Sequence, residues 1–282
     1  MKNLYLSSMV FGSQDLSLTV NECEKNKWNL EFSSGIPFML EVKKIFYESK
    51  IQKLAHNYFP APRIPFVLNL GSSNNEIRKK SILHCMAGLD LTKKTNGNFF
   101  SAHSGFCIDP LENMLGRKFI HNIKIDRELN KNLFINSLEE INDYALKTDT
   151  LFLIENNVLT TDNNNKINPL LCCDSDEIIE ILELMNSNNI GLLLDTGHLK
   201  VSCHTLKKSL KEEFIKLKSY VNAIHHSDND SINDLNNMIN TDYWFWEHSK
   251  DFVEIINIIE VKCNSKNDIR NQINIFLKNG VY

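Results

Sequence analysis

Short apolar runs that end in a charged or imidazole side chain recur along the chain. The clearest run, residues 190–194, consists of apolar residues and one glycine, and it leads to Asp195. A continuous run of this kind is typical of a strand that is buried on both faces. Comparable runs lead to Glu155, His225 and Glu260. The repetition indicates that several buried strands each present a polar side chain at their carboxyl end.

Strand-like and helix-like segments alternate from one end of the chain to the other. Apolar runs and alternating positions predict strands over 3–11, 28–32, 51–55 and 98–102, and four more that end at Glu155, Asp195, His225 and Glu260. Apolar residues at three-and-four spacing predict helices over 17–27, 37–49, 75–89, 134–146, 174–185, 205–220 and 268–277. About eight strand–helix units of roughly 35 residues each are typical of a (β/α)8 barrel, the TIM-barrel fold.

Nothing along the chain predicts a domain boundary, because no linker or low-complexity segment separates the alternating elements. We therefore expect residues 1–282 to form a single barrel domain. The connection over 104–132 is long for a segment without regular structure, so it is a candidate for a functional loop over the site.

A barrel of this kind brings the carboxyl ends of all its strands to one rim, where the active sites of such barrels lie. The polar residues at the predicted strand ends would then meet, although they are far apart in the sequence. These candidates are His56, His103, Glu155, Asp195, His198, His225 and Glu260. Carboxylates and imidazoles that share one cavity are costly to bury unless a cation binds them. A divalent metal ion is the simplest such cation.

Other interpretations of these residues remain open at this stage. Taken singly, each carboxylate is also compatible with a helix cap or an ion pair with a lysine. His225 competes with His226, but strand alternation puts the two on opposite faces, and only His225 has the x-x-Asp spacing to Asp228. The aromatic cluster 243–246 is compatible either with the wall of a sugar site or with packing against the barrel.

Composition excludes several classes of protein. With 42% hydrophobic and 23% charged residues, the 282-residue chain resembles an ordinary soluble globular protein. The formal net charge of -4 and pI near 6.1 make nucleic acid an unexpected partner. No apolar stretch approaches the roughly 18 residues that a membrane span needs, and the amino-terminal segment reads as a first strand and not as a signal peptide.

The cysteines suggest a reducing compartment. Seven cysteines, an odd number, are scattered along the chain without a CxxC pair. We interpret them as reduced thiols that serve in packing, which predicts a cytoplasmic protein.

The order of short motifs resembles that of a known superfamily. The motifs are His56 after the third strand, His103-Ser104-Gly105 after the fourth, Glu155-Asn156 after the fifth, Asp195-Thr196-Gly197-His198 after the sixth, His225-x-x-Asp228 after the seventh and Glu260 after the eighth. This order resembles the xylose isomerase-like TIM-barrel superfamily, which includes sugar and sugar-phosphate isomerases, epimerases and endonuclease IV. The resemblance covers nearly the whole chain.

The resemblance implies a role for each matching position. In the isomerases and epimerases, residues matching Glu155, Asp195, His225 and Glu260 hold a metal ion, and the two glutamates are also the acid–base pair. The residue matching His198 lies close to substrate or phosphate. In endonuclease IV, positions matching His56, His103 and His198 are zinc ligands as well, so in this chain they are candidates, with Asp228, for a second metal or for substrate binding.

The chain also departs from both patterns. It lacks the Asp-x-His that endonuclease IV carries after the seventh strand, where residues 229–237 read NDSINDLNN. It likewise lacks the basic residue that several epimerases carry shortly after His-x-x-Asp, because Asn229, Asp230 and Ser231 stand there.

Two functions follow as alternatives. The first is a metal-dependent sugar or sugar-phosphate isomerase or epimerase, in which Glu155 and Glu260 transfer a proton through an enediolate and the divalent metal is Mn, Co, Zn or Mg. The second is an endonuclease IV-like zinc phosphodiesterase that acts on abasic DNA. The acidic balance, the five arginines and the missing Asp-x-His favour the first, whereas His56 and His103 favour the second. A small sugar is the expected partner, a barrel used only for binding is not expected, and a homo-oligomer stays open.

Overall fold

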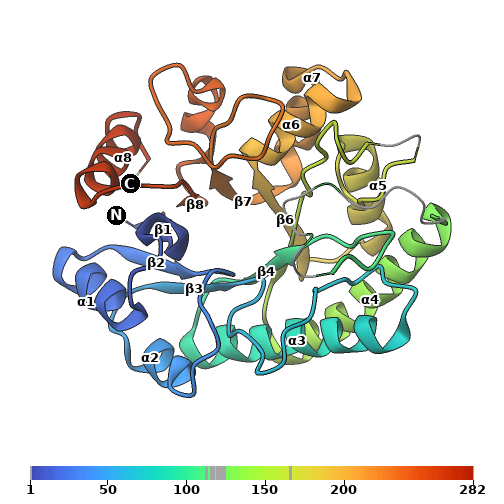
Figure 1. Ribbon diagram of the computed structural model, residues 1–282, viewed down its shortest axis with the longest axis horizontal. Coiled ribbons are helices and arrows are strands. Elements are labelled where there is room, and N and C mark those ends of the chain that lie inside the picture. Colours follow the sequence, from blue (N-terminus) through green and yellow to red (C-terminus); the bar gives the residue numbers. More distant parts are fainter. Residues whose placement is uncertain (1, 112–113, 115–117, 119–124, 165–166, 282) are drawn as a thin grey trace.

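A computed structural model shows the chain as a closed ring of parallel strands with helices around it (Figure 1). The structure describes residues 2–281 apart from 112–113, 115–117, 119–124 and 165–166. The strands are β1 (Leu4–Ser7), β2 (Asn29–Phe32), β3 (Lys53–His56), β4 (Phe100–His103), β5 (Phe152–Glu155), β6 (Ile190–Asp195), β7 (Val221–His226) and β8 (Ile256–Ile259). They follow one another around the ring in chain order, and β1 pairs with β8 to close it. The predicted (β/α)8 fold is confirmed.

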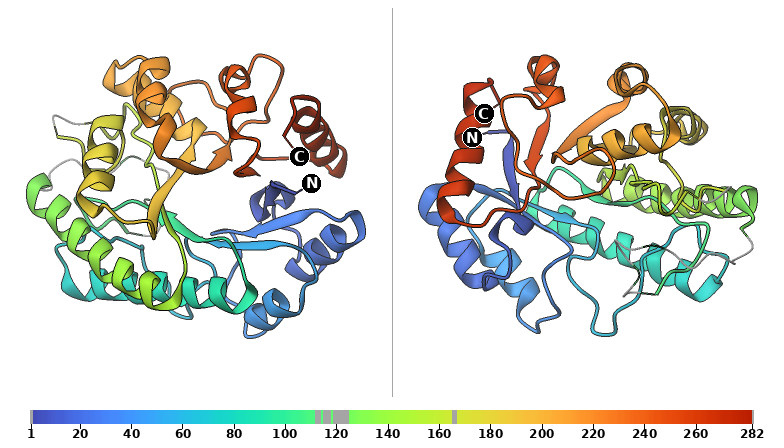
Figure 2. Two further views of the ribbon diagram at one scale, coloured as in Figure 1. Left: turned by 180° about the vertical axis from the view of Figure 1, so that it is seen from behind. Right: turned by 45° about the horizontal axis from the view of Figure 1, so that its top comes forward.

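Helices cover the outside of the ring (Figure 2). The α-helices are α1 (Leu16–Asn26), α2 (Val42–Glu48), α3 (Asn75–Thr95), α4 (Arg127–Thr148), α5 (Ser175–Met185), α6 (Thr196–Leu206), α7 (Leu210–Leu217) and α8 (Lys266–Lys278). Short 3₁₀ helices are η1 (Ser8–Phe11), η3 (Lys218–Tyr220), η4 (Trp244–Glu247) and η5 (Ser249–Phe252). Among the described residues, none of the helices is both long and apolar enough to cross a membrane. All seven cysteines are free, as predicted.

Three predicted helices have different bounds in the structure: the one predicted over 37–49 starts at Val42, the one over 75–89 continues to Thr95, and the one over 134–146 starts at Arg127. Two further elements differ more. The first strand ends at Ser7 and not at residue 11, because the Ser7 side chain accepts a hydrogen bond from Met9 N and caps the 3₁₀ turn η1. The single helix predicted over 205–220 is two helices, since Lys207 adopts the left-handed conformation that ends α6 and Ser209 caps α7. Most of α6 lies upstream of the prediction, directly after β6. The connection 104–132 falls partly outside the described residues, and its last part, from Arg127, belongs to α4.

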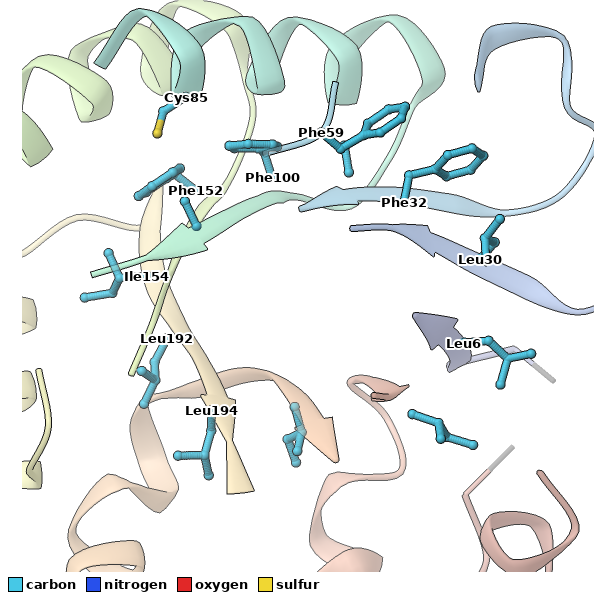
Figure 3. Packing of buried hydrophobic residues seen from close by; sticks show 14 of the residues in the cluster. Leu6, Leu30, Phe32, Phe59, Cys85, Phe100, Phe152, Ile154, Leu192 and Leu194 are labelled. Carbon is cyan, nitrogen blue, oxygen red and sulfur yellow. The ribbon is translucent and has the colours of Figure 1, made fainter. Parts of the chain in front are cut away.

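The core has two layers because successive side chains of a strand point to opposite faces. One layer lies between the strands and the helices, and Figure 3 shows part of it, including Leu30, Phe32 and Phe100. A smaller apolar cluster is formed by residues of the opposite parity in the strands and, for Phe99, directly before one: Tyr5, Leu54, Phe99, Leu153, Leu193, Ala223, Ile256 and Ile258. This second cluster fills the inside of the barrel, as in other barrels of this type.

The interior positions become polar toward the carboxyl ends of the strands. Two residues after the interior Leu153 comes Glu155, and two after Leu193 comes Asp195; the same step leads from Ala223 to His225. The apolar interior layer therefore forms the floor beneath a layer of buried carboxylates and imidazoles.

Candidate metal centre

Glu155, at the end of β5, lies at the centre of the polar layer. Its Oε2 is 3.2 Å from His56 Nε2 and 3.4 Å from His103 Nδ1. Its Oε1 is 3.1 Å from His225 Nδ1 and 3.7 Å from His198 Nδ1. These histidines come from β3, β4, β7 and α6, so the structure brings the four predicted imidazoles to one carboxylate.

Four of these side chains form a compact group of potential ligands. Glu155, Asp195, His225 and Glu260 each offer one atom, and the four atoms lie within 4.8 Å of one another. All four side chains are buried. Asp195 Oδ2 and Glu155 Oε2 have no hydrogen-bond partner, although Oε2 lies near two imidazoles without the alignment of a hydrogen bond. Buried carboxylate oxygens that lack donors are costly, and a divalent cation bound by this donor set would stabilise them.

A second, smaller group shares Glu155. His56, His103 and Glu155 also have ligand atoms within 4.8 Å of one another. His56 Nδ1 lies 2.9 Å from Ser101 Oγ, which leaves Nε2 toward Glu155. The geometry is therefore compatible with a second cation that shares the Glu155 carboxylate.

His198 directs one ring nitrogen, Nε2, toward two carboxylates of the site. Because the Asn156 carbonyl only accepts, His198 Nδ1 donates to it, at 2.9 Å. Nε2 then faces Asp234 Oδ2 at 3.6 Å and Asp195 Oδ2 at 4.0 Å. Asp234, which lies in the connection after β7, is not among the residues that the sequence motifs predict. Asp228, which is among them, belongs to none of the ligand groups found among the described residues; it accepts a hydrogen bond from Lys200 Nζ at 2.6 Å.

Glu31 is a further residue of the site that the sequence motifs do not predict. This residue is fully buried in β2, and its Oε2 lies 3.0 Å from His225 Nε2. The pattern of apolar runs that end in a polar residue does not mark it, because Glu31 lies inside a strand and not at its end. One feature of the sequence does point to Glu31: it is a carboxylate between two apolar residues, Leu30 and Phe32, in a short predicted strand. A charge buried in such a strand needs a partner.

Burial and neighbouring charges shift the pKa values of the site in opposite directions. Burial raises the pKa of Asp195 to about 7, although His198 counteracts it. Burial also acts on Glu260, but His225 beside it dominates and lowers the pKa of Glu260 to about 2. Burial lowers the pKa of His103 to about 4 in spite of Glu155. The layer thus combines groups whose charged form is favoured with groups whose charged form is disfavoured. Such shifted pKa values are common at functional sites.

His226 lies on the other face of β7, as predicted. Its Nδ1 is 3.0 Å from the Tyr243 hydroxyl and its Nε2 is 2.8 Å from Asn257 Oδ1. Its ring packs edge-on against Phe245 and Phe276, outside the strand ring. The aromatic cluster 243–246 therefore packs on the outside of the barrel, which is the second of the two interpretations that the sequence left open.

The fold and the site together define a class, the (β/α)8 barrels that carry a buried carboxylate and imidazole centre at the carboxyl ends of their strands. Residues 27–262 match the family described as the xylose isomerase-like TIM barrel. The chain belongs to this family. No curated protein matches the sequence.

Solved structures share the fold at low sequence identity. A D-tagatose 3-epimerase-like protein gives a TM-score of 0.73 at 16% identity, over 98% of this chain and 96% of that one. The IolI protein, solved with a bound zinc atom, gives 0.68 at 14% identity, over 98% and 97%. An AP endonuclease of family 2 from Brucella melitensis gives 0.66 at 11% identity, over 98% of both chains. At such identities the likeness establishes the fold alone, because one fold hosts many reactions.

Proposed function

We propose that the protein is a metal-dependent isomerase or epimerase of a sugar or sugar phosphate. The observation that carries the proposal is the group formed by Glu155, Asp195, His225 and Glu260, in which two glutamates from β5 and the end of β8 share one imidazole nitrogen. Several of the similar structures are named as epimerases of small sugars, or as similar to one: tagatose, psicose and ribulose. These names support the same substrate class here.

Glu155 and Glu260 are the proposed acid–base pair. They approach His225 Nδ1 at 3.1 Å and 2.8 Å from different strands, so a substrate held between them can lose a proton to one carboxylate and regain it from the other. A bound Mn, Co, Zn or Mg ion would polarise the substrate oxygens and stabilise the negative charge of the enediolate. Burial opposes ionisation of both groups, but the neighbouring histidines outweigh it and lower both pKa values, so both groups are carboxylates in the resting site. One of them accepts the substrate proton, and the other must first take up a proton from solvent before it can return one.

A specific observation favours a second candidate, a zinc phosphodiesterase of the endonuclease IV type. His56 and His103 join Glu155 in a second potential ligand group, and two metals in one site suit phosphodiester cleavage. The net charge of -4 weighs against DNA as the substrate, because phosphate backbones are bound through clustered basic residues.

One experiment separates the two candidates. The purified protein is analysed for bound metal and then assayed in deuterated water with a panel of ketoses, aldoses and their phosphates, and separately with DNA that contains an abasic site. We expect turnover of a sugar in wild type and a fall of at least about 100-fold in Glu155→Gln and Glu260→Gln, since general acid–base groups contribute about 10²–10⁴-fold. Solvent deuterium at the reacting carbon would identify the proton transfer. The opposite result would be metal-dependent cleavage of the DNA that is lost in Glu260→Gln, together with no turnover of any sugar. This result would overturn the isomerase proposal in favour of the phosphodiesterase.

We further propose a cytoplasmic location and small-molecule sugar partners. The support for the compartment is the set of seven unpaired cysteines, because disulfides are rare in the cytosol.

A further inference from the structure

Glu31 is fixed inside the barrel by its strand. Parallel pairing joins it to Ser7 of β1 and Leu54 of β3, and its neighbours Leu30 and Phe32 are fully buried in the layer beneath the helices. In the ring, β1 and β8 separate β2 from β7. The contact from Glu31 to His225 on β7 must therefore cross the barrel interior.

The Glu31 carboxylate does not stabilise the fold, so its presence needs another explanation. Glu31 is fully buried, and its Oε1 has no hydrogen-bond partner. Its Oε2 accepts a hydrogen bond from His225 Nε2 at 3.0 Å. A buried carboxylate with one oxygen unsatisfied costs more than an apolar residue of the same size, so a role at the site is the better explanation.

The two nitrogens of His225 face different partners. Both nitrogens are hydrogen-bonded to carboxylates and therefore donate: Nε2 to Glu31 Oε2 at 3.0 Å and Nδ1 to Glu155 Oε1 at 3.1 Å, with Glu260 Oε2 2.8 Å from Nδ1. A cation held by Glu155 and Glu260 would take the place of the Nδ1 proton. A carboxylate that accepts from one nitrogen of an imidazole keeps the proton there, fixes the ring, and leaves the other nitrogen as the ligand atom.

We propose that Glu31 is a positioning residue, which orients His225 across the barrel and presents its Nδ1 to a divalent cation held with Glu155, Asp195 and Glu260. The proposal rests on the metal binding of the proposed function. Glu31 itself stays outside the ligand set, because the His225 nitrogen that it contacts is not the one that faces Glu155 and Glu260.

A competing arrangement makes Glu31 a ligand. Glu31, His56 and His225 also have potential ligand atoms within 4.8 Å of one another. In that arrangement His225 Nε2 would have to bind the cation and not donate to Glu31. The number of bound metal ions distinguishes the two arrangements. Substitution of a ligand should remove one bound metal ion per chain, whereas substitution of a positioning residue should only weaken the affinity for the metal.

The test compares Glu31→Leu, which removes the acceptor, with Glu31→Gln, which keeps a weaker one. Glu213→Gln is the matched control, because Glu213 is also a buried carboxylate but accepts from Ser175 on the outer helix layer. For each full-length protein, Zn(II) affinity is measured by chelator competition, bound equivalents by elemental analysis at saturation, and the ring nitrogens of the zinc form by ¹⁵N NMR.

We expect Glu31→Leu to bind zinc about 10–100-fold more weakly than wild type, as removal of such partners of metal-binding histidines generally does. Glu31→Gln should lose several-fold, and Glu213→Gln should bind as wild type does. The number of equivalents at saturation should not change. In wild type, the NMR spectrum should show His225 protonated at Nε2 and metal-bound at Nδ1.

Wild-type affinity in a folded Glu31→Leu would overturn the inference, and if that variant does not fold, wild-type affinity in Glu31→Gln would do so. Loss of a whole equivalent in either variant would also overturn it and make Glu31 a ligand. A wild-type protein that binds no divalent metal would instead defeat the proposed function, so the two failures are distinguishable.

Discussion

The two carboxylate oxygens of Asp195 have different tasks. Oδ1 accepts a hydrogen bond from His198 N at 2.7 Å and caps the amino end of α6. Oδ2 is buried without a hydrogen-bond partner and belongs to the four-residue ligand group. The backbone of Asp195 is held in place, since Asn156 accepts from its N–H at 2.7 Å and donates to its carbonyl at 3.1 Å. One residue thus starts a helix and supplies a candidate ligand.

Substitution of Asp195 can separate the two tasks. Asp195→Asn keeps an oxygen that can cap the helix but removes the negative charge, whereas Asp195→Ala removes both. We expect both variants to lose most of their bound metal, and only Asp195→Ala to lose a further ~1 kcal/mol of helix-cap stability. Metal analysis and urea unfolding of the metal-free proteins check this, and full metal content in Asp195→Asn would show that Asp195 is not a ligand.

The pKa of Asp195 predicts the pH dependence of the metal-free protein. Burial raises its pKa from 3.8 to about 7 in the folded state. A carboxyl group with a raised pKa does not reduce the free energy of unfolding below its pKa in the unfolded state. Stability is then lost as the pH rises from that pKa through the pKa in the folded state. Because Asn mimics the neutral acid, metal-free Asp195→Asn should be more stable than wild type at pH 8, by an amount of the order of a few kcal/mol at roughly 1.4 kcal/mol per pKa unit. Urea midpoints of both proteins at pH 8 and pH 4.5 provide the measurement, and a stability gap that does not narrow at the lower pH would contradict it.

At the scale of elements, the strands were predictable and the connections were not. Runs such as 190–194 follow from burial on both faces, which any sequence with this topology must satisfy. The same alternation separated His225 from His226 correctly. Glu31 was not predictable from the pattern of strand ends because it lies inside β2. Asp234 was not predictable because its approach to His198 depends on the path of an irregular connection. The start of α6 was missed because its first turn, Thr-Gly-His, resembles a loop by composition although Asp195 caps it.

The packing of α3 against β4 gives a prediction at this scale. Gly88 in α3 lies so close to the strand layer that a Cβ there would overlap the ring of Phe100 (Figure 3 shows this ring). Gly88→Ala gains helix propensity of about 1 kcal/mol, but overpacking of a buried contact costs about 1–3 kcal/mol. We expect a net loss of stability, measured by urea unfolding.

Gly97 provides the matched control for this substitution. It follows the end of α3, does not have a positive φ, and a Cβ there would meet no atom closer than 3.6 Å. Gly97→Ala should therefore change the free energy of unfolding by no more than about 0.5 kcal/mol. Equal effects of the two substitutions would show that the α3–β4 contact is looser than described.

At the scale of the whole molecule, the site exists only because the ring closes. Glu31 and His225 lie on β2 and β7, which are connected around the ring through β1 and β8, and Ser7 of β1 donates to Glu260 at 3.2 Å. The two ends of the chain therefore build one side of the site together. A sequence pattern predicts each strand separately, whereas the distances across the interior depend on the registers of the whole ring.

Ring closure predicts that residues 1–282 unfold as one unit, which extends the barrel domain beyond the matched range 27–262. Tryptophans report on two regions: Trp28 precedes β2, while Trp244 and Trp246 pack against Phe214 and Phe276. In Trp28→Phe, fluorescence follows the second region; in a Trp244→Phe, Trp246→Phe double variant it follows the first.

Chains of this length often populate folding intermediates, so agreement between the two regions is informative. We expect both fluorescence transitions in urea to coincide with the far-UV circular dichroism transition, because neither half of an open ring can bury its strands. Two separate midpoints would instead divide the chain into independently folding parts, and the single-domain prediction for 1–282 would then be wrong.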